Sequence, residues 1–153
     1  MLLTADQAFE KLKKYCAYQE RCHTEVKQKL VREGFRGAEA AQILAELITD
    51  GFLNEERFAR SFTRGKFRIK KWGRLKIQAA LKAKGVSPAC LKKGLSEIND
   101  SEYLSTASQL LKKLIPPPAK TNSLDRQKAF RSLRTRGFEP ELISRLLGAE
   151  SAD

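Results

Sequence analysis

The stretch Leu81-Lys82-Ala83-Lys84-Gly85-Val86 has the form of a helix ending, and the same form occurs at residues 30–35 and 133–138. The three glycines of these endings lie 51 and 52 residues apart. In such an ending glycine takes the left-handed conformation after the helix, and the next apolar residue folds back on the residue five positions before it. Residues 47–52 end a further helix by the same device. The recurring pattern predicts an all-helical chain built from repeats.

The starts of the predicted helices also carry recognisable signals. Pro88 and Pro140 follow two of the glycine endings and take the first helical position, where the missing N–H costs nothing. Thr4, Asn54 and Asn99 are capping residues before three other helices. Apolar residues after the repeated glycines recur with helical spacing. They align as Ala40, Leu91 and Ile143, then Leu44, Leu95 and Leu147, then Leu47 and Ile98. Each repeat is therefore expected to contain three helices.

The predicted architecture is all-α, with three tandem three-helix repeats that form an elongated, curved array. The repeats are expected over residues 4–51, 53–98 and 99–148. Pro116-Pro117-Pro118 should break the third repeat after its first helix. A polar loop should then lead to a helix capped by Asn122 or Ser123.

Composition excludes several classes of protein. With 41% hydrophobic and 31% charged residues, the chain is too apolar for a disordered tail, and no window reaches the roughly 18 apolar residues of a membrane helix. The N-terminus lacks the pattern of a secretory signal. Three cysteines without framework spacing are typical of a reducing compartment. We therefore expect a soluble, cytoplasmic monomer with free thiols.

Positive charge is concentrated in the second repeat. Residues 57–96 contain 13 Lys and Arg and no Asp or Glu, so this window alone exceeds the net charge of +12 of the whole chain. Self-repulsion would destabilise so dense a cluster unless an anionic partner neutralised it. The window predicts a surface for a polyanion. The first and third repeats are near neutral, and their contacts would be with protein.

Two predicted helices at an angle carry these side chains and form a basic groove. On the first helix, basic residues lie on one stripe and apolar residues lie roughly opposite. The stripe comprises Arg57, Arg60, Arg64, Arg68 and Lys71, and the apolar side comprises Phe58, Phe62 and Ile69. Phe67 lies beside the stripe, where it could stack on a base or, as we prefer, contact the next repeat. Trp72, at the end of this helix, is interpreted as a packing residue.

The second basic helix, expected over about residues 74–84, directs Ile77 and Leu81 inward. The predicted contact residues are Arg57, Arg60, Arg64, Lys66, Phe67, Arg68, Lys70, Lys71, Arg74, Lys76, Lys82 and Lys84. If about six of them neutralised phosphates, log affinity would fall with log salt at a slope of roughly −5. No zinc-finger spacing or heptad zipper indicates sequence readout.

The residues of a catalytic or metal site are missing from the pattern. His23, beside the cap candidate Thr24, is the only histidine, and no nucleophile with a nearby base accompanies it. Cys16, Cys22 and His23 fit no common zinc spacing. The glycines in motifs end helices and form no phosphate loop. We expect no enzyme activity, no metal and no cofactor.

Several segments occur in the order typical of one family. They are Gly51-Phe52-Leu53-Asn54-Glu55-Glu56-Arg57-Phe58-Ala59, then Gly73-Arg74-Leu75-Lys76-Ile77, then Leu81 to Val86, with Arg21, Thr24-Glu25 and Val26 to Leu30 in the first repeat. Across nearly the whole chain this pattern resembles the RecX family of recombination regulators. Glu55-Glu56 stand where Asp is common in that family, and Trp72 stands where Tyr is usual.

The resemblance implies tandem three-helix repeats that bind the RecA filament and its single-stranded DNA. It also implies that RecA strand exchange, ATP hydrolysis and coprotease activity are inhibited. The residues alone leave an alternative, a general helical nucleic-acid-binding module that acts without RecA. A RecA-dependent gain in affinity would separate the two. A more remote alternative is a hydrolase that uses His23 or a cysteine.

Overall fold

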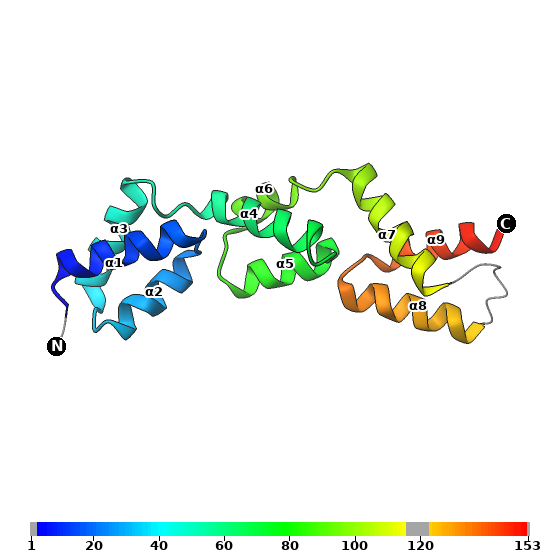
Figure 1. Ribbon diagram of the computed structural model, residues 1–153, viewed down its shortest axis with the longest axis horizontal. Coiled ribbons are helices and arrows are strands. Elements are labelled where there is room, and N and C mark those ends of the chain that lie inside the picture. Colours follow the sequence, from blue (N-terminus) through cyan, green and yellow to red (C-terminus); the bar gives the residue numbers. More distant parts are fainter. Residues whose placement is uncertain (1–2, 116–122, 153) are drawn as a thin grey trace. The chain divides into compact units, whose positions relative to one another are not determined.

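The computed structural model describes residues 3–115 and 123–152, and all regular structure in these ranges is helical. The helices are α1 (Ala5–Tyr18), α2 (His23–Arg32), α3 (Gly37–Thr49), α4 (Glu55–Arg68), α5 (Arg74–Ala83), α6 (Pro88–Leu95), α7 (Asp100–Leu114), α8 (Ser123–Arg136) and α9 (Pro140–Ala152) (Figure 1). The predicted all-α class is confirmed. The proline break at residues 116–118 and a cap at Asn122 lie outside the described residues.

All four predicted glycine endings are present. In each, the amide of the residue after the glycine donates to a carbonyl five residues back: Phe35 to Leu30 (2.9 Å), Phe52 to Leu47 (2.9 Å), Val86 to Leu81 (3.1 Å) and Phe138 to Leu133 (3.1 Å). The four glycines have φ between 78° and 101°, the left-handed region that the pattern requires. These endings are confirmed, because the signal depends only on residues adjacent in sequence.

The predicted helix starts are confirmed at five positions and wrong at one. The Thr4 and Asn54 side chains accept hydrogen bonds from the amides of the third residue after each, and Asn99 does the same. Pro88 and Pro140 are first residues of their helices. Thr24, however, is not a cap, because Cys22 takes that position. The Thr24 hydroxyl instead donates to the Lys84 carbonyl at 2.8 Å.

The chain divides into two compact units. Unit 1 comprises Met1–Phe62 and Leu81–Gly94, and unit 2 comprises Thr63–Ala80 and Leu95–Asp153. The division passes through α4 and α5, so each of these helices contributes residues to both units. The boundaries of the three sequence repeats, and the curved array, stay predictions.

The core of unit 1 lies among its first three helices, where α3 packs against both α1 and α2. Its buried residues are Ala8, Leu12, Cys16, Val26, Leu30, Phe35, Ile43, Leu47 and Leu53. Within α1, α2 and α3 the buried residues are spaced four apart, as on one face of a helix. Of the residues aligned from the sequence, Leu47 is buried, whereas Ala40 and Leu44 are partly buried. The hydrophobic effect at these positions is what holds the short helices together.

Unit 2 is organised around one buried tyrosine. In this unit α8 packs against α7 and α9. The ring of Tyr103, only 2% exposed, lies 5.8 Å from that of Phe67 and 5.1 Å from that of Phe138, measured between centroids. Both ring pairs are tilted, and aromatic contacts at such centroid distances stabilise a core beyond the area that they bury.

Of two apolar residues in the basic segment, Ile69 differs from the prediction, whereas Phe67 follows the preferred of its two interpretations, a contact with residues of the next predicted repeat. The helix ends at Arg68, so Ile69 lies past its end and is 78% exposed instead of facing the core. Phe67 is 3% exposed, and its contact with Tyr103 removes it from the candidate contact surface. Lys71 also lies beyond the helix, with φ of 58°, and therefore does not continue the helical stripe.

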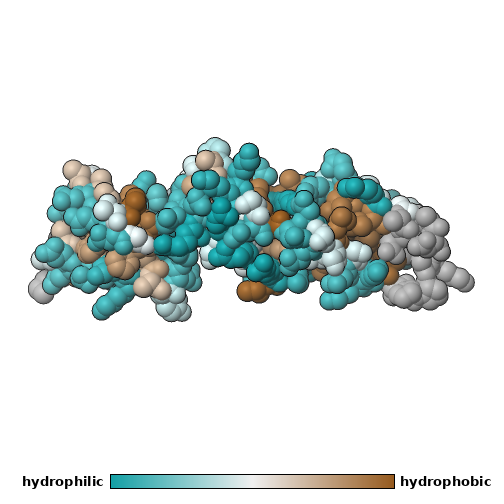
Figure 2. Space-filling view, turned by 90° about the horizontal axis from the view of Figure 1, so that it is seen from above, coloured by the Kyte–Doolittle hydropathy of each residue, from teal (hydrophilic) through white to brown (hydrophobic). Residues whose placement is uncertain are grey.

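The visible surface is mostly hydrophilic, and its apolar residues form smaller separate groups (Figure 2). Among the described residues, no helix combines the length and apolar character that crossing a membrane requires.

Candidate nucleic-acid interface

Three arginines of the predicted basic stripe are held in ion pairs. The pairs are Arg57 with Glu20 (2.5 Å), Arg60 with Glu56 (3.0 Å), and Arg64 with Glu97. The sequence had suggested a stripe of cations without acidic partners. The structure instead gives three of these arginines a carboxylate partner. Two of the carboxylates flank the acid-free window, and Glu20 comes from the neighbourhood of α1. An acid-free stretch of sequence is thus not an acid-free surface.

Glu56 shows how closely these charges are coupled. It accepts a hydrogen bond from Lys93 at 3.1 Å and another from Arg60 at 3.0 Å. The hydrogen bond from Lys93 is the largest cause that lowers the pKa of the Glu56 carboxyl, and the hydrogen bond from Arg60 is the next largest. A lowered pKa favours the charged form, so these contacts persist at neutral pH and weaken as the pH falls through the folded pKa.

Arg74 also forms ion pairs within the protein. Its guanidinium contacts Asp100 at 2.5 Å and Glu139 at 3.6 Å, and lies 4.0 Å from the centroid of the Tyr103 ring. The Arg74 amide donates to the Tyr103 hydroxyl at 3.0 Å, and that hydroxyl donates to Glu139. Burial, and then the hydrogen bond to Glu139, raise the pKa of Tyr103, so it stays protonated as a donor. Arg74 fixes the start of α5 in unit 2.

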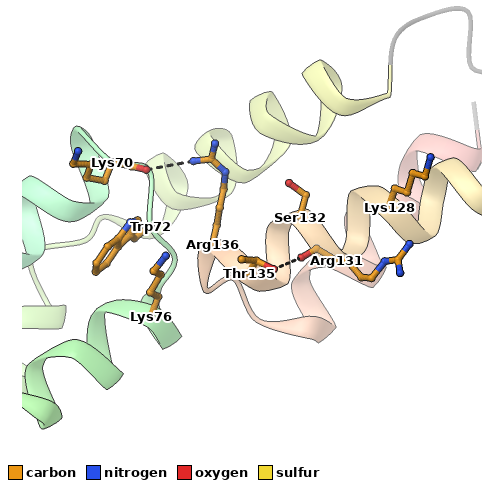
Figure 3. A pocket seen from close by; sticks show the side chains of 8 residues that line it. All are labelled: Lys70, Trp72, Lys76, Lys128, Arg131, Ser132, Thr135 and Arg136. Carbon is orange, nitrogen blue, oxygen red and sulfur yellow. Dashed lines mark hydrogen bonds between the residues drawn. The ribbon is translucent and has the colours of Figure 1, made fainter.

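Other cations of unit 2 gather around one pocket of about 520 Å³ (Figure 3). We call it the basic pocket; it is lined by Lys70, Trp72, Lys76, Lys128, Arg131, Ser132, Thr135 and Arg136. Five of these side chains are cationic and none is acidic. Its volume is within the roughly 300–1,000 Å³ of ligand sites in proteins. The pocket combines five cations with one aromatic ring, and Lys128 and Arg131 lie farther along α8 from that ring (Figure 3).

Backbone hydrogen bonds bring the two walls of the basic pocket together. The Gly73 amide donates to the Arg136 carbonyl at 2.7 Å, and the Leu75 amide donates to the Gly137 carbonyl at 2.9 Å. The Arg136 guanidinium donates to the Lys70 carbonyl at 3.3 Å (Figure 3). The end of α8 is thereby fixed against the segment that enters α5.

The aromatic member of the pocket is Trp72. Its side chain is half-buried, and the ammonium groups of Lys66 and Lys76 lie 4.9 and 4.5 Å from the ring centroid. From the sequence, Trp72 was interpreted as a packing residue, and Phe67 as a residue that contacts the next repeat or, less favoured, stacks on a base. Phe67 is buried against Tyr103, in line with the favoured interpretation, and Trp72, although half-buried, lines the pocket.

The predicted contact residues are divided between the units. Arg57, Arg60, Lys82 and Lys84 belong to unit 1, and Arg64, Lys66, Phe67, Arg68, Lys70, Lys71, Arg74 and Lys76 belong to unit 2. Only Lys70 and Lys76 of this set line the basic pocket. Their role as contacts with a partner stays a prediction.

The contribution of α8 was missed by sequence reasoning. The third repeat was judged near neutral, yet residues 123–136 contain five basic residues and one acidic residue. Lys128, Arg131 and Arg136 of this helix line the basic pocket. The charge was counted for each repeat. A count for each predicted helix would have indicated these three cations.

Cys16, Cys22 and His23 were the candidates for a metal site or a nucleophile. No group of three or more His, Cys, Asp and Glu residues among the described residues could hold a metal ion. Burial is the main cause that raises the pKa of the Cys16 and Cys22 thiols, so both stay protonated at neutral pH and are weak nucleophiles.

A thiol reagent should therefore distinguish the three free cysteines. We expect Cys90, which is half-buried, to react first at pH 8. Cys16 and Cys22 are 6% and 1% exposed and should react only as the chain unfolds. Mass spectrometry after labelling with one equivalent of reagent measures the order. Equal labelling of all three in the folded protein would contradict it.

Comparisons with known proteins give a consistent result. The sequence profile described as "RecX, second three-helix domain" matches residues 54–95. The protein named Regulatory protein RecX of Chlorobaculum tepidum is 33% identical over 132 residues, which cover 84% of this chain and 81% of that protein. The Regulatory protein RecX of Lactobacillus johnsonii is 30% identical over 129 residues, or 84% of this chain and 48% of the relative. This chain thus spans about half the length of the Lactobacillus relatives.

A solved structure shares the fold. The crystal structure of RecX from Lactobacillus salivarius superposes with a TM-score of 0.86 at 21% identity, and the match covers 97% of each chain. A second crystal structure, of regulatory protein RecX, gives a TM-score of 0.81 at 20% identity, with 94% of this chain and 71% of the other covered.

Proposed function

This chain belongs to the RecX family of regulatory proteins, and from that premise we propose that it regulates the RecA recombinase. It binds the RecA filament together with the single-stranded DNA that the filament carries, and it lowers RecA activity in recombination and DNA repair. It acts in the cytoplasm as a monomer, by binding and not by catalysis, without a membrane, metal or cofactor.

The basic pocket is the observation that carries the DNA part of this proposal. Five cations line it with no carboxylate among them, and Trp72 supplies an aromatic ring. Cations neutralise phosphates whatever the bases, and an aromatic ring can stack on any base. The expected binding is therefore to single strands without sequence preference.

The ion-paired arginines suit a protein partner. Arg57, Arg60 and Arg64 each have a carboxylate partner already, so they can exchange it for a carboxylate of another protein. Such an exchange gives specificity more than affinity, because one ion pair is lost for each one that forms. We propose that these residues contact RecA, whereas the basic pocket contacts DNA.

A second function is favoured by the same pocket. The cations and the aromatic ring could bind single-stranded DNA without any other protein. The chain would then be a general nucleic-acid-binding module. Its affinity for DNA would be the same with or without RecA.

The rate of ATP hydrolysis by a RecA from the same organism on single-stranded DNA separates the two functions. We expect hydrolysis to fall when this protein is present at a small fraction of the DNA-binding sites, because a regulator of a filament need not cover the DNA. The control is the affinity of the protein for the same DNA without RecA. A fall that occurs only at ratios that coat the DNA would indicate competition for DNA and contradict regulation.

A further inference from the structure

We propose that the basic pocket is a base-stacking subsite for single-stranded DNA, in which one base lies on the Trp72 indole, an adjacent phosphate contacts Lys76, and phosphates farther along the strand contact Arg131 and Lys128. This inference rests on the proposed binding of DNA and adds the atoms that hold the strand. It assigns base contact to a ring in unit 2 that the sequence had assigned to packing.

The chemistry of the pocket lining is the first argument. Its charged side chains are all cations, and the two uncharged polar ones are hydroxyls. The Thr135 hydroxyl already donates to the Arg131 carbonyl at 2.9 Å. An indole beside several cations matches a ligand with a flat ring and more than one phosphate. An acidic peptide would use the cations and leave the ring without a partner.

The cations above the ring are the second argument. The Lys76 ammonium lies 4.5 Å from the Trp72 centroid, a cation–π contact at a half-exposed site. A base that stacks on this face displaces the ammonium, which can turn to the adjacent phosphate on its flexible stem. Stacking of a base on an aromatic ring contributes more than an exposed cation–π contact, so the exchange favours binding.

The spacing along α8 is the third argument. Lys128 and Arg131 are three residues apart, which places both on one face of the helix and in the lining of the same pocket. Both side chains are exposed, and no ion pair between either of them and a described carboxylate is found. Successive cations that lead away from an aromatic ring can contact successive phosphates of a strand. A free nucleotide carries its phosphates at one end only and would leave the more distant cations without a contact.

Single-strandedness follows from the ring. In a duplex the faces of each base are covered by its neighbours, so a protein ring reaches a base only where the strand is unpaired and flexible. We therefore expect oligo(dT) to bind this subsite and a duplex of the same length to contact the cations without the ring.

Fluorescence of the intact protein tests the proposal directly, because Trp72 is the only tryptophan in the chain. We expect oligo(dT) to quench its emission to a plateau at the concentrations at which a labelled oligo(dT) shows binding by anisotropy. Inorganic polyphosphate, which has the charge but no base, should compete for binding with little quenching. Thymidine monophosphate should quench only at much higher concentration.

Each other outcome overturns the proposal. If oligo(dT) saturated the protein without quenching, the DNA would bind elsewhere. If polyphosphate quenched as strongly as oligo(dT), the site would recognise charge alone and no base. Quenching by thymidine monophosphate at the concentration of the oligonucleotide would make it a site for free nucleotides. These results leave the RecA hydrolysis experiment unaffected, so failure of the subsite and failure of the regulatory function are distinguishable.

Two variants extend the test. Trp72→Phe keeps an aromatic face and should retain affinity for oligo(dT) within about threefold, whereas Trp72→Ala should lose about 5- to 150-fold. Circular dichroism checks that both variants fold. Equal affinity of folded Trp72→Ala and wild-type protein would overturn the stacking role, and the quenching measurement needs no variant.

Discussion

Gly137→Ala is expected to destabilise unit 2 by about 3 kcal/mol, from strained backbone and overpacking together. Gly137 has φ of 101°, which an alanine adopts only with strain. A Cβ at this position would also lie 2.4 Å from the Cβ of Lys76 and 2.6 Å from its backbone nitrogen. These atoms belong to α5 and cannot give way, because the Leu75 amide ties the same segment to the Gly137 carbonyl.

Three other glycines separate the two causes. A Cβ on Gly73 would lie 2.3 Å from the Gly137 carbonyl carbon, and Gly73 has no positive φ, so Gly73→Ala measures crowding, at about 2 kcal/mol. Gly51 has φ of 81° and open space, so Gly51→Ala measures strain, at about 1 kcal/mol. Gly65 lies inside α4 in open space, and Gly65→Ala should stabilise by about 0.5–1 kcal/mol.

Urea unfolding provides the measurement. Circular dichroism follows the helices of the whole chain, and Trp72 fluorescence follows unit 2 alone, because the one tryptophan lies there. We expect Gly137→Ala and Gly73→Ala to lower the midpoint seen by fluorescence and Gly51→Ala to leave it nearly unchanged. A midpoint for Gly137→Ala equal to that for Gly65→Ala would contradict the close packing of α5 on the end of α8.

The fold was predictable because its signals are local. A Schellman ending requires a glycine and two apolar residues within six positions, and Leu133 to Phe138 satisfies this without any knowledge of the neighbours. The caps at Asn54 and Asn99 depend on residues three positions away. The one helix start that was misassigned, at Thr24, is the one whose side chain makes a distant contact, with Lys84.

The candidate site was predictable only in part, because its charges are arranged by tertiary contacts. The helical wheel placed Phe67 beside the basic stripe and left base stacking and a contact with the next repeat both open; only the contact with Tyr103, 36 residues later, decides for the second, preferred one. The pairing of Arg57 with Glu20 joins residues 37 apart. The cations of α8 line the same pocket as Trp72 because a backbone hydrogen bond joins Gly73 to Arg136. None of these contacts leaves a periodic signal in the sequence.

Neutralising three cations of the basic pocket should weaken binding to oligo(dT) strongly. In the triple variant Lys76→Gln, Lys128→Gln and Arg131→Gln, three phosphate contacts are lost while the side chains stay polar and keep part of their aliphatic length. The slope of log affinity against log salt should become shallower by about 2, since each contact with a single strand contributes about 0.7. At low salt we expect a loss of affinity of at least about tenfold. Fluorescence anisotropy of labelled oligo(dT) between about 50 and 200 mM salt measures both quantities.

The matched control replaces the three ion-paired arginines, as Arg57→Gln, Arg60→Gln and Arg64→Gln. Both triple variants lower the net charge by the same amount, so any effect of overall charge on the approach of DNA is equal in the two. The arginines already have carboxylate partners, and their loss should change the salt slope less than the loss of the pocket cations. Equal slopes for the two variants would mean that net charge and not the basic pocket governs binding. If the control variant instead keeps its affinity for DNA and fails to slow ATP hydrolysis by RecA, the paired arginines belong to the contact with RecA. DNA binding and inhibition of RecA would then depend on different residues.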